Sequence, residues 1–165
     1  AQVIIGAPAG VDGGFYEAIF TAGGGESFDI AAFHDYSGSA RRIVALARAL
    51  RKLLTLHGQA GKPIWLGEFS IGEDMEDDAR QRALLAHVLK SNSPIAMAQW
   101  YNLRDDSSCV CCPPRSVKDA HWGLVRRDGT RKDGYYALKR LIAAGLPVVR
   151  STRGYDHQRE PFNFI

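Results

Sequence analysis

The sequence contains little cysteine, no long apolar run and no dense basic patch. Its three cysteines all fall within residues 109–112, and an odd number of cysteines cannot close an internal disulfide framework. None of its apolar runs reaches the roughly 18 residues that a membrane span requires. The net charge is only +3, and the basic residues are dispersed over expected helix faces. We therefore expect neither a membrane partner nor a nucleic-acid partner.

The clustered cysteines leave two interpretations open. Cys109, Cys111 and Cys112 could hold a metal together with His121, because thiolates and imidazoles are zinc ligands. Their spacing matches no common zinc motif, however. It favours loop cysteines, one of which could form a disulfide to another chain. We expect no metal and no cofactor.

The length of 165 residues suits one domain with its own hydrophobic core, and the hydrophobic fraction of 45% is that of a globular protein. The chain begins at Ala1 without an initiator methionine or a signal segment, and apolar strand residues follow almost at once. We expect a piece of a longer protein. The localisation stays open.

Apolar runs and helical patterns alternate along the chain in four units. The expected strands cover residues 3–6, 28–36, 63–69 and 95–103, and the expected helices cover residues 15–22, 39–57, 73–89 and 134–144. Alternating strands and helices predict a parallel sheet covered by helices, and eight such units make a TIM (β/α)8 barrel. We therefore predict an α/β fold, half of a TIM barrel, over residues 1–146. Residues 147–165 form a tail that we leave unassigned.

Glu68 ends the third predicted strand, at the sheet edge where chemistry is done in parallel α/β folds. The alternative is an ordinary glutamate that caps the following helix. Because side chains alternate across a strand, we place Glu68 on one face with Ile64 and Leu66. Trp65, Gly67 and Phe69 are assigned to the other face.

The same alternation puts polar or aromatic groups at the ends of two neighbouring strands: His34 and Tyr36 on one, Trp100 and Asn102 on the other. An aromatic ring can stack on a sugar, histidine, tyrosine and asparagine can bind its hydroxyls, and a carboxylate can attack its anomeric carbon. Taken singly, a tryptophan such as Trp100 is more often a core residue than a sugar platform, and a histidine such as His34 is more often a hydrogen-bonded structural residue. Together they indicate a sugar site around Glu68.

Four segments carry a resemblance to a known group of enzymes: residues 28–36, 61–69, 98–105 and 121–136. They resemble strands six to eight, and the start of helix eight, of clan A glycoside hydrolases, with families 39 and 5 as the nearest relatives. The resemblance implies a retaining mechanism on β-linked oligosaccharides or polysaccharides. It also implies that Glu68 is the nucleophile, that His34 and Tyr36 line the site, and that Trp100 is the sugar platform.

The sequence departs from that group in one respect. Its enzymes carry the general acid/base in an Asn-Glu pair ending strand four, and no such pair occurs here. Retaining hydrolysis needs two carboxyl groups about 5–5.5 Å apart. We therefore expect the C-terminal half of a glycosidase, inactive alone, that forms a homodimer or joins a complementary half-barrel. The alternative is a non-catalytic half-barrel that self-associates or binds carbohydrate.

Overall fold

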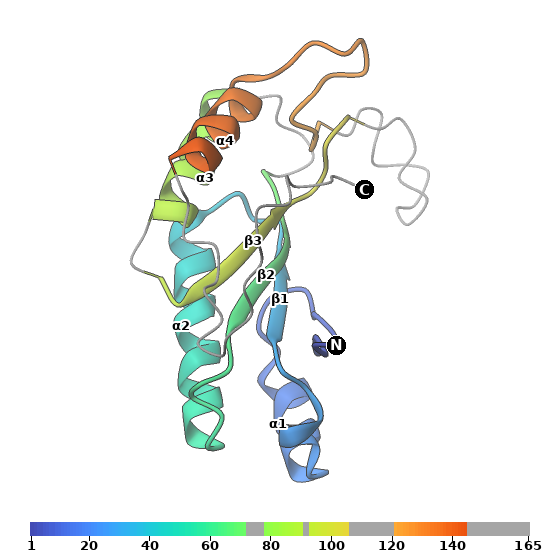
Figure 1. Ribbon diagram of the computed structural model, residues 1–165, viewed down its shortest axis with the longest axis vertical. Coiled ribbons are helices and arrows are strands. Elements are labelled where there is room, and N and C mark those ends of the chain that lie inside the picture. Colours follow the sequence, from blue (N-terminus) through green and yellow to red (C-terminus); the bar gives the residue numbers. More distant parts are fainter. Residues whose placement is uncertain (72–77, 91–92, 106–120, 145–165) are drawn as a thin grey trace.

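A parallel three-stranded sheet forms the centre of the computed structural model, which describes residues 1–71, 78–90, 93–105 and 121–144. The strands lie in the order β1 (Ala31–Asp35), β2 (Ile64–Phe69) and β3 (Ile95–Trp100), as Figure 1 shows. The predicted α/β class and the parallel pairing are confirmed. The predicted tail and the three cysteines lie outside the described residues.

The first predicted strand differs from the prediction. Ile4 and Ala9 form isolated parallel bridges to Ile30 and His34, so the N-terminal segment runs along β1 without becoming a strand of the sheet. Pro8 explains part of the difference, because proline has no N–H to donate to a ladder. Within the described residues the sheet therefore has three strands.

In the described part of the chain, four α-helices and one short 3-10 helix connect and cover the strands. They are α1 (Gly13–Thr21), η1 (Gly24–Ser27), α2 (Ala40–Leu56), α3 (Asp78–Lys90) and α4 (Asp133–Ala143). Ser39 begins α2 as predicted, because its hydroxyl accepts a hydrogen bond from Arg42 N at 3.3 Å. Asp12 caps α1 in the same way, accepting from Gly14 N at 2.8 Å. None of the helices in the described part has the length and apolar character to cross a membrane.

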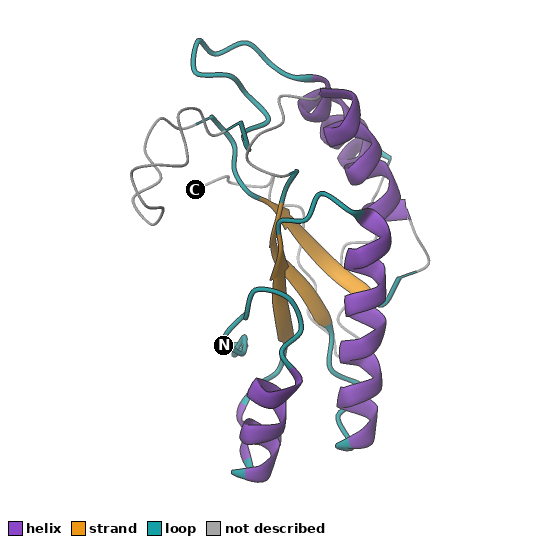
Figure 2. Ribbon diagram, turned by 180° about the vertical axis from the view of Figure 1, so that it is seen from behind, coloured by secondary structure: helices purple, strands orange, loops and turns teal. Residues whose placement is uncertain are grey.

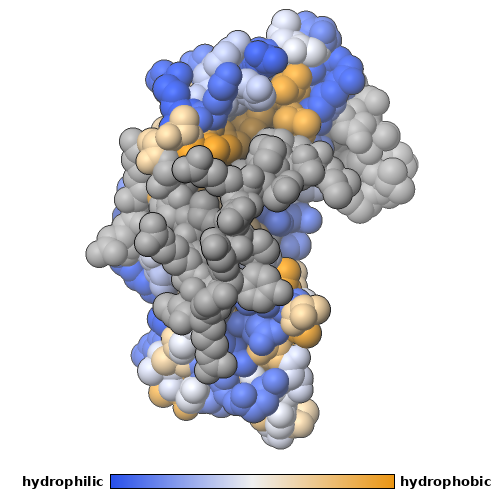
Figure 3. Space-filling model, in the orientation of Figure 1, coloured by the Kyte–Doolittle hydropathy of each residue, from blue (hydrophilic) through white to orange (hydrophobic). Residues whose placement is uncertain are grey.

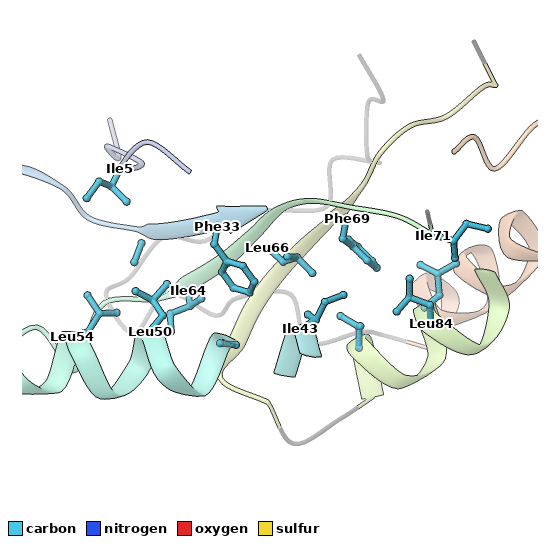
Figure 4. Close-up of a cluster of buried hydrophobic side chains, with 14 of the residues drawn as sticks. Ile5, Phe33, Ile43, Leu50, Leu54, Ile64, Leu66, Phe69, Ile71 and Leu84 are labelled. Atoms are coloured by element: carbon cyan, nitrogen blue, oxygen red, sulfur yellow. The ribbon is translucent and has the colours of Figure 1, made fainter. Parts of the chain in front are cut away.

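The hydrophobic core lies between the sheet and helices α2 and α3, which stand on one side of it (Figure 2). Figure 4 shows side chains of the strands and of these helices meeting in this layer: Phe33, Ile64, Leu66, Phe69, Ile43, Leu50, Leu54 and Leu84. The visible surface of the described residues is largely hydrophilic with smaller apolar patches (Figure 3).

Tyr16 ties α1 to the sheet. Its side chain is fully buried, and its hydroxyl donates to the carbonyl oxygen of Ala32 at 2.5 Å. Burial raises the pKa of Tyr16 to about 12, because the ionised phenolate would lose its hydration.

A register shift in β2 decides which side chains reach each face. Phe33 pairs with Leu66, but the next residue, His34, pairs with Glu68, so Gly67 is an extra residue in β2. Such a bulge changes the direction of the side chains that follow it. As a result Leu66 and Phe69 both lie in the core, three residues apart. The predicted grouping of Leu66 with Glu68 on one face is therefore wrong.

Candidate active site

Glu68 lies on the face of the sheet opposite the core, near the carboxyl end of β2. Its side chain is 37% exposed, and the hydroxyl of Tyr36 donates a hydrogen bond to its Oε2. His34 Nδ1 lies 3.6 Å from the same oxygen. The structure thus brings three of the five predicted site residues together. Among the described residues, Glu68 thus receives its hydrogen bond from the residue that follows β1.

Gly67 makes room for this arrangement. A Cβ atom at position 67 would lie 2.9 Å from Nε2 and 3.1 Å from Cδ2 of His34, closer than normal packing allows. The imidazole of His34 therefore lies directly against the backbone of the bulge. A residue without a side chain at this point lets His34 and Glu68 approach each other.

Trp100 faces the core side of the sheet, which corrects its predicted place beside Glu68. It pairs with Phe69, and the two ring centroids are 5.1 Å apart. Its Nε1–H donates to the carbonyl oxygen of Trp122 at 2.7 Å. The extra residue in β2 again explains the difference. Leu66 pairs with Ala98, and Phe69 pairs with Trp100. Alternation counted on each strand separately misses this shift and therefore places Trp100 on the wrong face.

Asn102, the fifth predicted residue, follows β3, and within the described residues no hydrogen bond joins it to Glu68. Its backbone carbonyl accepts from Leu124 N at 3.3 Å, and its peptide bond with Tyr101 is cis. Its side-chain Oδ1 is buried and has no hydrogen-bond partner among the described residues. The same holds for the indole Nε1 of Trp122 within this part of the chain. An acceptor and a donor are therefore left unsatisfied close to the ends of the strands.

Sequence reasoning missed two aromatic residues. The ring centroids of Tyr101 and Trp122 lie 5.8 Å and 6.2 Å from that of Tyr36, and 5.6 Å from each other. We call Tyr36, Tyr101 and Trp122 the aromatic cluster. Counting alternation across the β2 bulge would have selected Tyr101 in place of Trp100. Trp122 lies outside regular secondary structure, where no periodic signal exists.

Two other acidic residues near strand ends form ion pairs with basic residues. Asp35 Oδ2 accepts from Arg42 Nε at 2.8 Å, and Asp105 Oδ1 accepts from Lys132 Nζ at 2.8 Å. Both carboxylates are almost fully buried. Neither can serve Glu68 as the second carboxyl group of a retaining pair.

A metal site is not evident in the described part of the chain. Across residues 1–71, 78–90, 93–105 and 121–144, no group of three or more His, Cys, Asp or Glu side chains could hold a metal ion. The cysteines considered for that role lie outside these ranges.

Comparisons with known proteins agree with this picture at the level of the fold. No protein-family model and no curated protein matches the chain. Among solved structures, xylanase 10B from Thermotoga petrophila RKU-1, crystallised with xylobiose, aligns with a TM-score of 0.59 and 16% identity. The alignment covers 88% of this chain and 47% of the xylanase. The chain therefore folds like part of a TIM barrel. It spans about half the length of this neighbour.

A second solved structure is a GH128 (subgroup VI) exo-beta-1,3-glucanase from Aureobasidium namibiae. It aligns with a TM-score of 0.47 and 12% identity over 66% of this chain and 40% of the glucanase. At these identities structural likeness concerns the fold and not the activity. Function has to be argued from the site itself.

Proposed function

We propose that the chain is the C-terminal half of a retaining β-glycoside hydrolase and that Glu68 is its nucleophile. The observation that carries the proposal is the engagement of Glu68 by Tyr36 and His34, on the face opposite the core, in a sheet that folds like part of a xylanase. Both neighbours engage Oε2, which leaves Oε1 to attack an anomeric carbon. The finer assignment to families 39 and 5 stays a prediction.

The aromatic cluster takes the sugar-platform role that the sequence assigned to Trp100. Tyr36 belongs both to the sugar platform and to the surroundings of the nucleophile, because its ring contacts Tyr101 and Trp122 and its hydroxyl donates a hydrogen bond to Glu68. A pyranose beside this cluster would present its C–H face to the rings and its anomeric carbon to the carboxylate.

Two unpartnered atoms support a hydroxyl-rich ligand. Burying an unpaired N–H or C=O group costs about 1–3 kcal/mol. A sugar hydroxyl can accept from Trp122 Nε1 or donate to Asn102 Oδ1, both of which lack partners. Asn102 therefore stays a proposed substrate-binding residue.

The second carboxyl group is proposed to come from a complementary half-barrel. Within the described residues β3 has no strand on its outer side, and at the other margin Val3 and Ile4 are 51% and 47% exposed. Unpaired edges invite association. A homodimer is the second possibility, but it would place the two Glu68 side chains across the barrel from each other. The chain alone should therefore turn over little or no substrate.

Trapping of the glycosyl–enzyme intermediate tests the proposal. A 2-deoxy-2-fluoro-β-xylobioside with a dinitrophenolate leaving group needs little acid assistance, so the carboxylate can displace it without the missing partner. We expect mass spectrometry to find the sugar on Glu68. The label should be absent in Glu68→Gln and unchanged in Glu17→Gln, whose carboxylate contacts His57 far from the site.

Other outcomes separate the alternatives. Labelling that persists in Glu68→Gln would contradict the nucleophile assignment. Absence of label, combined with xylobiose binding that Trp122→Ala abolishes, would favour the non-catalytic carbohydrate-binding half-barrel. A stable monomer in sedimentation at micromolar concentration would contradict the predicted association.

A further inference from the structure

A short segment without regular secondary structure carries the ring that completes the aromatic cluster. Trp122 is only 7% exposed, although the segment formed by residues 121–123 belongs to no helix or strand. We call these residues the Trp122 segment. The aromatic cluster exists only if this segment is held in one position against Tyr36 and Tyr101.

Side chains from other parts of the chain bind the backbone of the Trp122 segment at every residue. The bonds are Lys132 Nζ to His121 O at 3.0 Å, Trp100 Nε1 to Trp122 O at 2.7 Å, Gly123 N to Asp105 Oδ1 at 2.8 Å, and Gln81 Nε2 to Gly123 O at 3.0 Å. Three of these four side chains belong to residues that are buried. A loop held in this way is fixed by specific polar contacts and not by packing alone.

The ion pair between Lys132 and Asp105 is central to this arrangement. Lys132 is fully buried, and its Nζ lies 2.8 Å from Asp105 Oδ1. Each partner also makes a hydrogen bond to the segment, Lys132 to the carbonyl of His121 and Asp105 to the amide of Gly123. A buried ion pair adds little net stability compared with apolar residues, because desolvation of the charges is costly. The main contribution of the pair is therefore the geometry that it imposes on the Trp122 segment.

Gly123 allows the segment to lie this close. A Cβ atom there would be 2.2 Å from the backbone nitrogen of Asp105 and 2.5 Å from the carbonyl carbon of Arg104. The two stretches of backbone are thus in direct contact, and the ion pair lies beside this contact.

We propose that Lys132 and Asp105 are positioning residues, which hold the Trp122 ring against Tyr36 and thereby shape the surface beside Glu68. The consequence for sugar binding rests on the proposed function. The positioning of the ring does not, so it can be measured without any ligand.

Near-UV circular dichroism provides that measurement. The difference spectrum between the wild type and Trp122→Phe defines the signal of Trp122 in its aromatic surroundings. In the double variant Asp105→Asn with Lys132→Met, no unpaired charge is left buried, and we expect this signal to fall by at least half while the far-UV spectrum is retained. Asp78→Asn is the matched control. It removes the 2.9 Å ion pair with Arg126, which joins the same part of the chain to α3, and should leave the Trp122 signal unchanged.

Thermal melting gives a second test should the double variant fail to fold. In Asp105→Asn the Trp122 signal should disappear at a lower temperature than the far-UV helix signal, whereas in the wild type both should melt together. Coincident melting in this variant would overturn the proposal. A Trp122 signal that survives in the folded double variant, or one that Asp78→Asn also removes, would overturn it as well.

Calorimetry with xylobiose distinguishes this inference from the proposed function. If the wild type binds, the double variant should bind at least about tenfold more weakly, a loss of about 1.4 kcal/mol, and Asp78→Asn should bind normally. Binding that is equal in the double variant and the wild type would contradict a role for the pair in shaping the site. If the wild type does not bind while the Trp122 signal responds as expected, the proposed function fails and the positioning role stands.

Discussion

The contact between Gly67 and His34 predicts that the effect of Gly67→Ala on stability depends on the imidazole of His34. In Gly67→Ala the new methyl group would lie 2.9 Å from His34 Nε2, where ordinary contacts begin near 3.4 Å. Gly67 does not have a positive φ, so alanine fits the backbone conformation. The cost therefore comes from the imidazole alone, and overpacking of this kind costs about 1–3 kcal/mol.

Removing the ring should remove the cost. In a His34→Ala background the remaining neighbour of the new methyl group is Ala7 Cβ at 3.8 Å, which is a normal contact. Replacement of glycine by alanine at a compatible position stabilises a protein by roughly 0.4–1 kcal/mol through the unfolded chain. We therefore expect Gly67→Ala to destabilise the wild type and to be neutral or stabilising in His34→Ala. The coupling free energy should be about 1–3 kcal/mol.

Urea unfolding followed by tryptophan fluorescence measures all four proteins of this double-mutant cycle. The same cost of Gly67→Ala in both backgrounds would refute the reasoning, because it would show that the backbone of the bulge and not the imidazole requires glycine. Glycosyl trapping on Gly67→Ala adds a functional measurement. Displacement of His34 from Glu68 should slow the labelling.

Three further predictions concern the elements that support the site. Tyr16→Phe should cost about 1–3 kcal/mol in neutral urea unfolding, because the carbonyl of Ala32 loses its donor. The neutral phenol is favoured in the fold, so its stabilisation is complete below pH 10 and is lost towards pH 12. Between pH 10 and pH 12 the wild type should therefore lose about 2–3 kcal/mol relative to Tyr16→Phe, so that its advantage disappears or reverses, and a constant difference would contradict the raised pKa. Leu66→Ala should cost about 2–5 kcal/mol by calorimetry, and a smaller loss would place Leu66 outside the core. Ser39→Ala should cost about 0.5–2 kcal/mol in urea unfolding, and no loss would exclude a capping role.

Local signals allowed the helices to be predicted from the sequence. The Ser39 cap and the apolar stripe of α2 depend only on residues within a few turns of each other, so they predict the start of α2 correctly. Alternation also placed His34 and Tyr36 on one face of their strand, but the meeting of both residues with Glu68 depends on the extra residue in β2. The helix starts were thus accessible without a structure, whereas the pairing with Glu68 was not.

The remaining features depend on pairing between distant segments. Nothing in the sequence around Gly67 shows that β2 carries an extra residue, since the register is set by β1 and β3. This shift turned Trp100 towards Phe69 and brought Tyr101 to the site. Trp122 depends on contacts to four separate parts of the chain, which a local pattern cannot contain. The predicted strand at residues 3–6 likewise forms only an isolated bridge, from Ile4 to Ile30, within the described residues.

Because β2 contains an extra residue, the fold and the site are sensitive to the insertion or deletion of a residue in this strand. Before Gly67 the core positions fall on even numbers, Ile64 and Leu66, and after it the core position is the odd-numbered Phe69. Deleting Gly67 would restore regular alternation and exchange the environments of the next two residues, so that a carboxylate would enter the apolar layer and a phenyl ring would enter the site. Insertion or loss of one residue here would therefore do more harm than most substitutions. In related chains, alignments that place a gap within this strand would pair residues of opposite roles.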